Sequence, residues 1–318
     1  MTVSIPAATS SSPAVLVAGS VAYDTVLATP GRFSDTLTPE GLDHINLTFP
    51  TPVMRRSFGG CAANIAWAML ALGGRPVLWG ALGADGGPYL DRFKSWARTS
   101  RALSFWRIAS RRNASSRRMR TETRSPPSMR GRSTVRTKRR CPKRARNSRF
   151  SRRANGARRS DRPSGASKQA FRICSIPDRR HPCTGPKASK TLVAGAFGVA
   201  FSDYEAELLE RFTGLTPRML AASGKTVWHT HGAHGSSVWR PGADEPVFVP
   251  AATLPEGKSA VDPVGAGDAY RGGLLWGLVE GADPVEAARA GAYAAAVKVT
   301  HRGSQDYALS RAVALALI

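Results

Sequence analysis

The sequence predicts an α/β fold with a central, mostly parallel sheet, and three observations lead to it. Short apolar runs that end in glycine alternate with helix-forming stretches, which is typical of strands joined by crossover helices. Hydrophobic residues make up 42% of the 318 residues, enough for one globular core. No apolar run is long enough to span a membrane, and the four cysteines are too scattered for a disulfide framework. A cytoplasmic protein is therefore expected.

The first elements form a β-α-β unit. Residues 14–19 (AVLVAG) predict a buried first strand, and Asp24 follows beyond its end, where open α/β sheets bind ligands. The pair Gly59-Gly60 leads into the helix IAWAMLALGG, which stops at its final two glycines. The run RPVLWGALG predicts the second strand.

The same alternation returns after residue 190. An apolar stretch precedes a helix that opens at Ser202 and carries Glu205 in its first turn. KTVWHTHGAHGSSVW predicts two strands joined around Gly232 and Gly235. DPVGAGDAYRGG then opens an apolar helix, and an Ala-rich helix and a short terminal helix follow.

The net charge of +24 is confined to the middle of the chain. Residues 101–190 hold 29 Lys and Arg against 3 acidic residues, whereas the rest holds 17 basic and 19 acidic residues. Leu, Ile, Val and Phe together supply only eight of these ninety residues, too few to bury a core. We therefore divide the chain into residues 1–95, an aberrant basic segment at 96–189 from which no strand or helix is expected, and residues 190–318.

The stretch 262–273 carries the strongest chemical signal. Gly265, Ala266 and Gly267 open a helix, so their N–H groups and the positive helix end point at one place, which favours a phosphate or a developing oxyanion. Asp268 stands beside them, where a carboxylate can take a proton from a hydroxyl that attacks a γ-phosphate. The alternative is an acidic residue that merely favours the helix dipole. A base next to an anion hole favours phosphoryl transfer.

Two long motifs in this order resemble the ribokinase-like (PfkB) carbohydrate kinase family. DPVGAGDAYRGG is similar to its C-terminal signature, and FGGCAANIAWAMLALGG to its N-terminal one. PGRFSDTLTPEGLDHINLTF and HRGSQDY resemble bacterial adenosine kinases in particular. The resemblance covers about residues 14–95 and 190–310. It implies a ribokinase-like sandwich with a small β lid, here with its central part disrupted.

The resemblance also implies an activity: ATP- and Mg²⁺-dependent transfer of the γ-phosphate to a hydroxymethyl group of a ribosyl substrate, most like adenosine. Another sugar or nucleoside kinase of the family, such as a ribokinase, is the alternative. A homodimer is left open. The implied roles are catalytic base for Asp268, anion hole for Gly265, Ala266 and Gly267, substrate binding for Asp24, Gly59, Gly60 and Asn64, ATP binding for Gly232 and Gly235, and metal binding for Glu205. Ser202 stands where the family's metal motif has Asn.

A frameshift would explain the basic segment. Ser115–Thr134 can be encoded so that the adjacent frame reads IITADADGNQITAFHAGAID, which alternates like a hairpin around Asp-Gly-Asn. The same shift turns Cys174–Arg180 into a strand end with turn residues. Our hypothesis is a kinase gene whose frame is lost near Lys94–Trp96 and regained near Lys187–Lys190. The chain as written is then expected to be impaired.

Three further features compete with this interpretation. A basic nucleic-acid-binding arm is the alternative from another class, and it would lose affinity steeply with salt; we rank it below because the segment is Ser-, Arg- and Pro-rich. The run Ala222–Thr226 imitates a phosphate-binding loop but lacks its leading glycine, since Met219 stands there. His229, His231 and His234 favour a surface strand over a metal site, because no carboxylate or Cys lies nearby.

Overall fold

The computed structural model describes residues 13–28, 53–100, 104–105, 109–110, 173–174 and 193–318. Its strands are β1 (Ala14–Ala18), β2 (Ala22–Ala28), β3 (Val53–Gly59), β4 (Arg75–Trp79), β5 (Ala81–Leu82), β6 (Ser104–Phe105), β7 (Ala109–Ser110), β8 (Ile173–Cys174), β9 (Gly198–Ser202), β10 (Thr226–Thr230), β11 (Ser236–Trp239) and β12 (Val247–Val249). Its helices are α1 (Cys61–Ala71), α2 (Gly87–Ser100), α5 (Asp203–Thr213), α6 (Pro217–Ala222), α7 (Ala266–Glu280), α8 (Pro284–Val299) and α9 (Arg311–Leu315), with a 3₁₀ turn, η3 (Gly232–His234).

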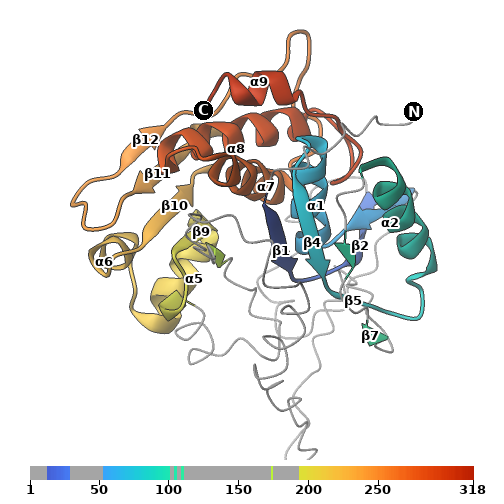
Figure 1. The fold of residues 1–318 in the computed structure, drawn as a ribbon, viewed down its shortest axis with the longest axis horizontal. Helices are drawn as coiled ribbons and strands as arrows, with labels where there is room; N and C mark the ends of the chain where they lie inside the picture. Colours follow the sequence, from blue (N-terminus) through green and yellow to red (C-terminus); the bar gives the residue numbers. More distant parts are fainter. Residues whose placement is uncertain (1–12, 29–52, 101–103, 106–108, 111–172, 175–192) are drawn as a thin grey trace, which may run out of the picture.

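The described strands confirm the α/β class but not one continuous sheet. Strands β1, β4 and β6 pair in parallel in one group. In the other group, β8, β9 and β10 are parallel, and β11 and β12 continue it in antiparallel order (Figure 1). Among the described residues no hydrogen-bonded pairing joins the two groups. The predicted mostly parallel sheet is thus present as two parts.

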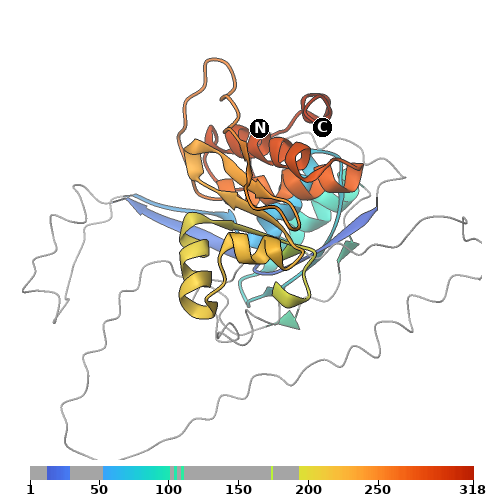
Figure 2. The ribbon, with the colours of Figure 1, turned by 90° about the vertical axis from the view of Figure 1, so that its left-hand side faces the viewer.

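Strands β2 and β3 form the small β element that the resemblance predicts. They pair antiparallel over seven residues and extend as a long two-stranded ribbon (Figure 2). Asp24 follows the end of β1, as the sequence predicts, and lies on β2 opposite Ser57. The segment between these strands, 29–52, lies outside the described residues.

Strand β1 is not buried, contrary to prediction. Ala14, Leu16 and Ala18 are exposed, and only Val17 is buried. An apolar strand is buried only when neighbouring strands and helices cover it. Among the described strands, β1 pairs with β4 alone. One of its faces and one of its edges therefore lack the partners that would bury them.

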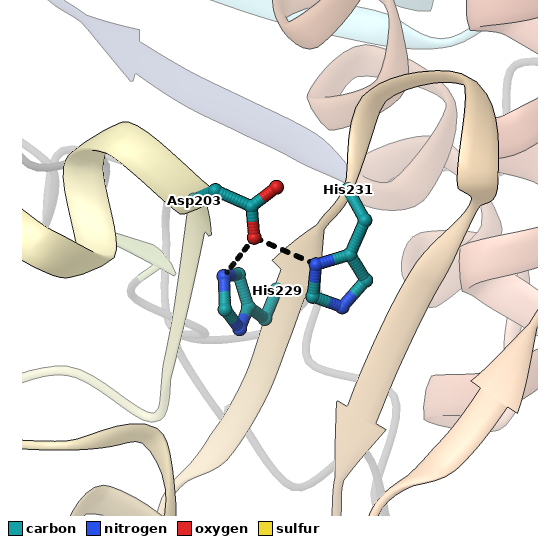
Figure 3. A group of neighbouring side chains, drawn as sticks. All are labelled: Asp203, His229 and His231. Carbon is teal, nitrogen blue, oxygen red and sulfur yellow. Dashed lines mark hydrogen bonds and ion pairs between the residues drawn. The ribbon is translucent and has the colours of Figure 1, made fainter.

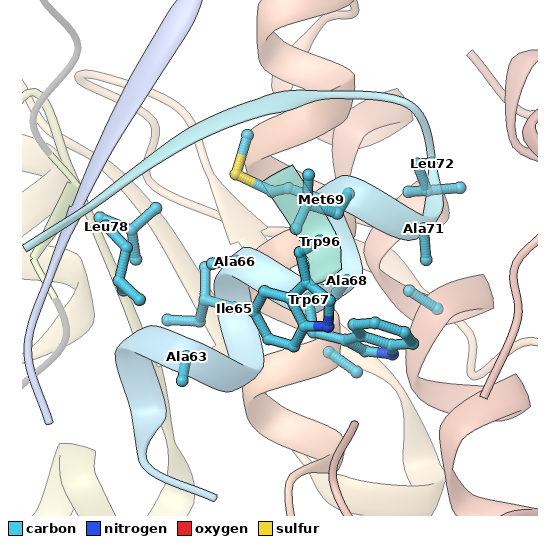
Figure 4. Close-up of a cluster of buried hydrophobic side chains, with 14 of the residues drawn as sticks. Ala63, Ile65, Ala66, Trp67, Ala68, Met69, Ala71, Leu72, Leu78 and Trp96 are labelled. Carbon is cyan, nitrogen blue, oxygen red and sulfur yellow. The ribbon is translucent and has the colours of Figure 1, made fainter. Parts of the chain in front are cut away.

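The core is built around α7, which packs against both α1 and α8 (Figure 1). Ten of the eleven α1 residues are buried, and Trp67 stacks near Trp96 of α2 with ring centroids 5.1 Å apart (Figure 4). Helix α7 approaches both neighbours closely, because a Cβ at Gly272 would meet the Ala68 Cβ at 2.4 Å. A Cβ at Gly273 would meet the Ala290 carbonyl oxygen at 2.5 Å.

No described helix is both long and apolar enough to cross a bilayer.

Local signals placed most of the other elements correctly. Helix α5 begins with the predicted capping box, in which Ser202 and Glu205 exchange hydrogen bonds. Gly224 joins α6 to β10, so the run Ala222–Thr226 leads from a helix into a strand, the reverse of a phosphate-binding loop, as predicted.

The basic segment contributes more than the sequence predicted. Strands β6, β7 and β8 lie within residues 96–189 and pair with β4, β5 and β9. Each has two residues, too short to show an alternating pattern. Helix α2 also crosses the boundary drawn between residues 95 and 96. Most of the segment, including the stretch Ser115–Thr134, lies outside the described residues, so the frameshift hypothesis stays a prediction.

The close contact of α7 with α1 predicts that Gly272→Ala destabilises the fold. Its new Cβ would lie 2.4 Å from Ala68 Cβ and 2.8 Å from the Ile65 carbonyl oxygen, so a helix must shift. We expect a loss of about 1–3 kcal/mol in the free energy of unfolding, measured by urea denaturation. Gly87→Ala is the control, because nothing lies within 4 Å of its added Cβ. Equal stability of the two variants would contradict the packing argument.

Candidate functional site

The site is built around the carboxylate of Asp268 in the first turn of α7. Its residue is only 8% exposed. The side-chain amide of Asn64, on α1, donates a hydrogen bond to Asp268 Oδ2 at 2.9 Å. The Arg271 guanidinium lies one turn further along α7, 3.5 Å from Oδ1. Two residues predicted from separate motifs, 204 positions apart, are thus in direct contact.

Burial raises the pKa of Asp268 above the ordinary value of an aspartic acid. The positive charge of Arg271 and the hydrogen bond from Asn64 act in the opposite direction. A carboxylate raised in pKa but still held by a cation is a stronger proton acceptor than a solvated one. The arrangement can therefore take a proton from a hydroxyl group.

A chain of hydrogen bonds continues from Asn64 to the C-terminal loop. Gln305, fully buried, donates to Asn64 Oδ1 at 2.8 Å and to the Tyr89 hydroxyl at 2.6 Å. Tyr89 in turn donates to the Gly59 carbonyl oxygen at 2.5 Å. Asn64 therefore uses both ends of its amide inside the protein, and its geometry is that of a residue that orients Asp268.

Glu205 lies on the other side of Asp268, joined to it through Arg271. Glu205 Oε2 accepts a hydrogen bond from Arg271 at 2.5 Å and from the Ser202 backbone N–H at 2.8 Å. Its hydrogen bonds to described residues all use Oε2. The other carboxylate oxygen is left for a ligand, which fits Mg²⁺, an ion commonly held by one or two carboxylates together with phosphate and water.

The predicted anion hole has two open donors instead of three. Gly265 adopts a left-handed backbone with φ 85° and caps α7. The Ala266 N–H donates to the Pro263 carbonyl oxygen at 3.1 Å, because the turn that leads into the helix requires that bond. The N–H groups of Gly265 and Gly267 make no hydrogen bond to any described residue. These two donors, at the positive end of a fifteen-residue helix, can face an anion.

The loop before α7 is held by a buried lysine. Lys298, at the end of α8, has no exposed surface and donates to the Asp262 carbonyl oxygen at 2.6 Å and to the His301 carbonyl oxygen at 3.4 Å. Asp262 in turn accepts from the backbone N–H groups of Val264 and Gly303. The backbone around Gly265 is therefore fixed before any ligand arrives.

The residues predicted to bind the substrate meet where β2, β3 and α1 join. A Cβ at Gly59 would lie 2.2 Å from the Asp24 carboxylate, so only glycine leaves room for that side chain. Gly60, with φ 90°, caps α1 and would strike the backbone of Ser20 and Ala22 if it carried a Cβ. Asp24 is half-buried here.

The glycine turn that is predicted to bind ATP lies at the end of β10. Gly232 and Gly235 bracket η3 with φ 58° and 112°, and a Cβ at Gly235 would strike the Val249 carbonyl oxygen. The Tyr270 hydroxyl bonds Ser236 at 3.0 Å, which connects this turn to α7. The expectation that no carboxylate accompanies the histidines is wrong, since Asp203 contacts His229 and His231.

Sequence reasoning missed Arg271, Gln305 and Tyr89. A signal existed for Arg271, which stands three residues after Asp268 on the same helix face. Gln305 lies in the HRGSQDY run, but nothing in that run shows that its amide reaches Asn64.

A separate cavity of about 440 Å³ lies against α6 and includes Lys225, whose ammonium group bonds carbonyl oxygens of Ala194 and Ala196. That cavity does not include Asp268 and holds no candidate for the same chemistry.

Comparison with known proteins finds one family model and several similar structures. Residues 166–311 match the pfkB family carbohydrate kinases. The structure of a Burkholderia thailandensis nucleoside kinase in complex with inosine is similar at 25% identity and a TM-score of 0.63, over 96% of this chain and 95% of that one. A Cryptococcus neoformans ribokinase in complex with ADP has 18% identity and a TM-score of 0.61, over 97% and 100%. A Methanocaldococcus jannaschii nucleoside kinase has 15% identity and a TM-score of 0.61, over 96% and 97%. The ribokinase-like fold is thereby confirmed.

The buried lysine gives a prediction about the loop before α7. Lys298→Met would leave the Asp262 and His301 carbonyl oxygens without their shared donor inside the protein. We expect a loss of about 2–4 kcal/mol in the free energy of unfolding, measured by urea denaturation. Lys258→Met, at an exposed lysine, is the control and should change stability by less than about 0.5 kcal/mol. A Lys298 variant as stable as this control would show that the loop does not depend on the ammonium group.

Proposed function

Because the chain carries a pfkB family carbohydrate kinase domain on a ribokinase-like fold, we propose that it is built to phosphorylate a nucleoside at the expense of ATP, with adenosine as the leading substrate. The observation that carries the proposal is the buried Asp268 carboxylate beside the open N–H groups of Gly265 and Gly267. Among the similar structures, the Burkholderia thailandensis nucleoside kinase in complex with inosine and in complex with ADP-inosine, at 25% and 26% identity, favours a nucleoside over a free sugar. A ribokinase activity is the alternative.

In the proposed reaction, Asp268 accepts the proton of the substrate hydroxymethyl group as its oxygen attacks the γ-phosphorus of ATP. The bond between that phosphorus and the bridging oxygen breaks, and ADP leaves. The Gly265 and Gly267 N–H groups and the N-terminal end of α7 stabilise the charge on the transferred phosphoryl group. Asn64, assigned from sequence to the ribose hydroxyls, is bonded to Asp268 and Gln305, so we assign it to positioning the base.

The other predicted residues complete the proposed site. Asp24, in the space left by Gly59 and Gly60, would hold the ribose hydroxyls. Gly232 and Gly235 would let the backbone approach ATP closely. Glu205 would hold Mg²⁺, which when bound neutralises phosphate charge. Arg271 contacts both Glu205 and Asp268, so it would hold the proposed metal ligand and the proposed base at a fixed distance from each other.

The frameshift hypothesis predicts that the activity of this chain is impaired, because the basic segment would then stand in place of strands that complete the sheet. The test compares the chain as written with a chain whose frame is repaired across residues 95–190. We expect the repaired chain, but not the chain as written, to phosphorylate adenosine with ATP. Inosine and ribose are included in the assay as competing substrates. Full activity of the chain as written would overturn the frameshift hypothesis. A repaired chain inactive on all three substrates would overturn the proposed function.

Replacing the base should abolish turnover in the repaired chain. Asp268→Asn keeps the size of the side chain but cannot accept the proton, so we expect kcat to fall by about 10²–10⁴-fold with little change in ATP binding. Asp244→Asn is the control, because Asp244 is an exposed partner of Arg218. A kcat for the Asp268 variant within a few-fold of this control would exclude Asp268 as the base.

The pH dependence of kcat/KM tests the link between Arg271 and Asp268. The base must be ionised, so activity falls as the pH drops through its pKa, which burial places above the usual range. Arg271→Met removes a charge that lowers this pKa, so the acid limb of the profile should move to higher pH. Arg271→Lys keeps the charge and should leave the limb closer to its original position. An unmoved limb in Arg271→Met would show that Asp268 does not control it.

A further inference from the structure

Two parallel strands bring three metal-ligating side chains together beside the glycine turn that is predicted to bind ATP. Asp203 follows the C-terminal end of β9, and His229 and His231 lie at the C-terminal end of β10. The strands pair in parallel with Thr230 opposite Ser202, so their ends meet at one edge. Figure 3 shows the Asp203 carboxylate between the two imidazole rings.

The ligand atoms of these residues lie within reach of one ion. Asp203 Oδ1 is 2.7 Å from His231 Nδ1 and 2.8 Å from His229 Nε2, and one ligand atom from each residue lies within 4.8 Å of the others. His229 Nε2 is buried and makes no aligned hydrogen bond despite this proximity. This buried nitrogen is therefore available as a metal ligand.

The surroundings of the two rings also suit a metal. His231 Nε2 lies 2.9 Å from the Ser237 hydroxyl oxygen, which can accept a hydrogen bond from the N–H at that position while Nδ1 binds the ion. Burial and the nearby His231 lower the pKa of His229, and a metal requires the neutral imidazole. The Asp203 side chain is 62% exposed, whereas those of His229 and His231 are 17% and 25% exposed. The cluster is therefore open to solvent on one side.

We propose that Asp203, His229 and His231 form a binding site for a zinc-class divalent transition-metal ion, with a fourth position open to water or another ligand. Two imidazole nitrogens and one carboxylate oxygen favour Zn²⁺ and its neighbours over Mg²⁺, which prefers oxygen ligands. The site is separate from Glu205, which stands two residues along α5 and turns toward Ser202 and Arg271. Binding displaces the proton shared between His231 and Asp203.

The test is a Zn²⁺ titration of the untagged full-length chain without nucleotide, by competition with a chromophoric chelator. We expect one saturable site whose affinity falls at least about tenfold in Asp203→Asn and in His231→Ala. His234→Ala is the matched control, because His234 is exposed on the same turn but outside the cluster. Circular dichroism in EDTA establishes that each variant is folded like the parent chain.

A second measurement separates the site from metal binding elsewhere in the chain. Zn²⁺ should raise the thermal unfolding midpoint of the parent chain and of His234→Ala, but not that of Asp203→Asn. Absence of a saturable site in the parent chain would overturn the proposal. Undiminished affinity in both cluster variants would overturn it too, because the ligands would then lie elsewhere, for example among the cysteines. The readouts are independent of kinase activity, so neither outcome bears on the proposed reaction.

Discussion

The burial of the Asp268 carboxylate is the constraint around which the two described parts of the chain are organised. A carboxylate removed from water is costly unless charged or hydrogen-bonding partners replace its hydration. Asn64 supplies one partner from α1, and Arg271 supplies a positive charge from α7. Each of these is itself held, Asn64 by Gln305 and Arg271 by Glu205. A single buried charge therefore ties α1, α5, α7 and the C-terminal loop into one geometry.

This geometry needs helices that approach closely. Glycines at 272 and 273 let α7 touch α1 on one side and α8 on the other without intervening side chains. The close approach brings Asn64 within hydrogen-bonding distance of Asp268. At the end of α8, Lys298 fixes the loop that turns into α7, so that Gly265 and Gly267 present their N–H groups from a rigid backbone. Packing and polar contacts thus determine the same arrangement.

The strands are less well packed than the helices. Leu16 on β1 is 50% exposed and Trp79 on β4 is 43% exposed, although both lie on strands of a central sheet. Exposed strand faces and edges promote pairing with other chains. Among the described residues, the basic segment supplies the two-residue strands β6, β7 and β8. The candidate site around Asp268 and the completeness of the sheet are separate properties of this chain.

Local patterns in the sequence predict the α/β class, the helix that begins after Gly265, the capping box at Ser202 and the candidate base Asp268. All of these depend on local signals, such as glycine turns, caps and apolar periodicity, which act over a few residues. It also predicted Asn64, Glu205 and the glycine turns, but only as parts of motifs. Only the tertiary structure decided that Asn64 holds Asp268, that Arg271 and Gln305 belong to the site, and that Asp203 reaches His229 and His231. These contacts join residues up to 241 positions apart, and they form because parallel strand ends and closely packed helices converge, which no local pattern encodes.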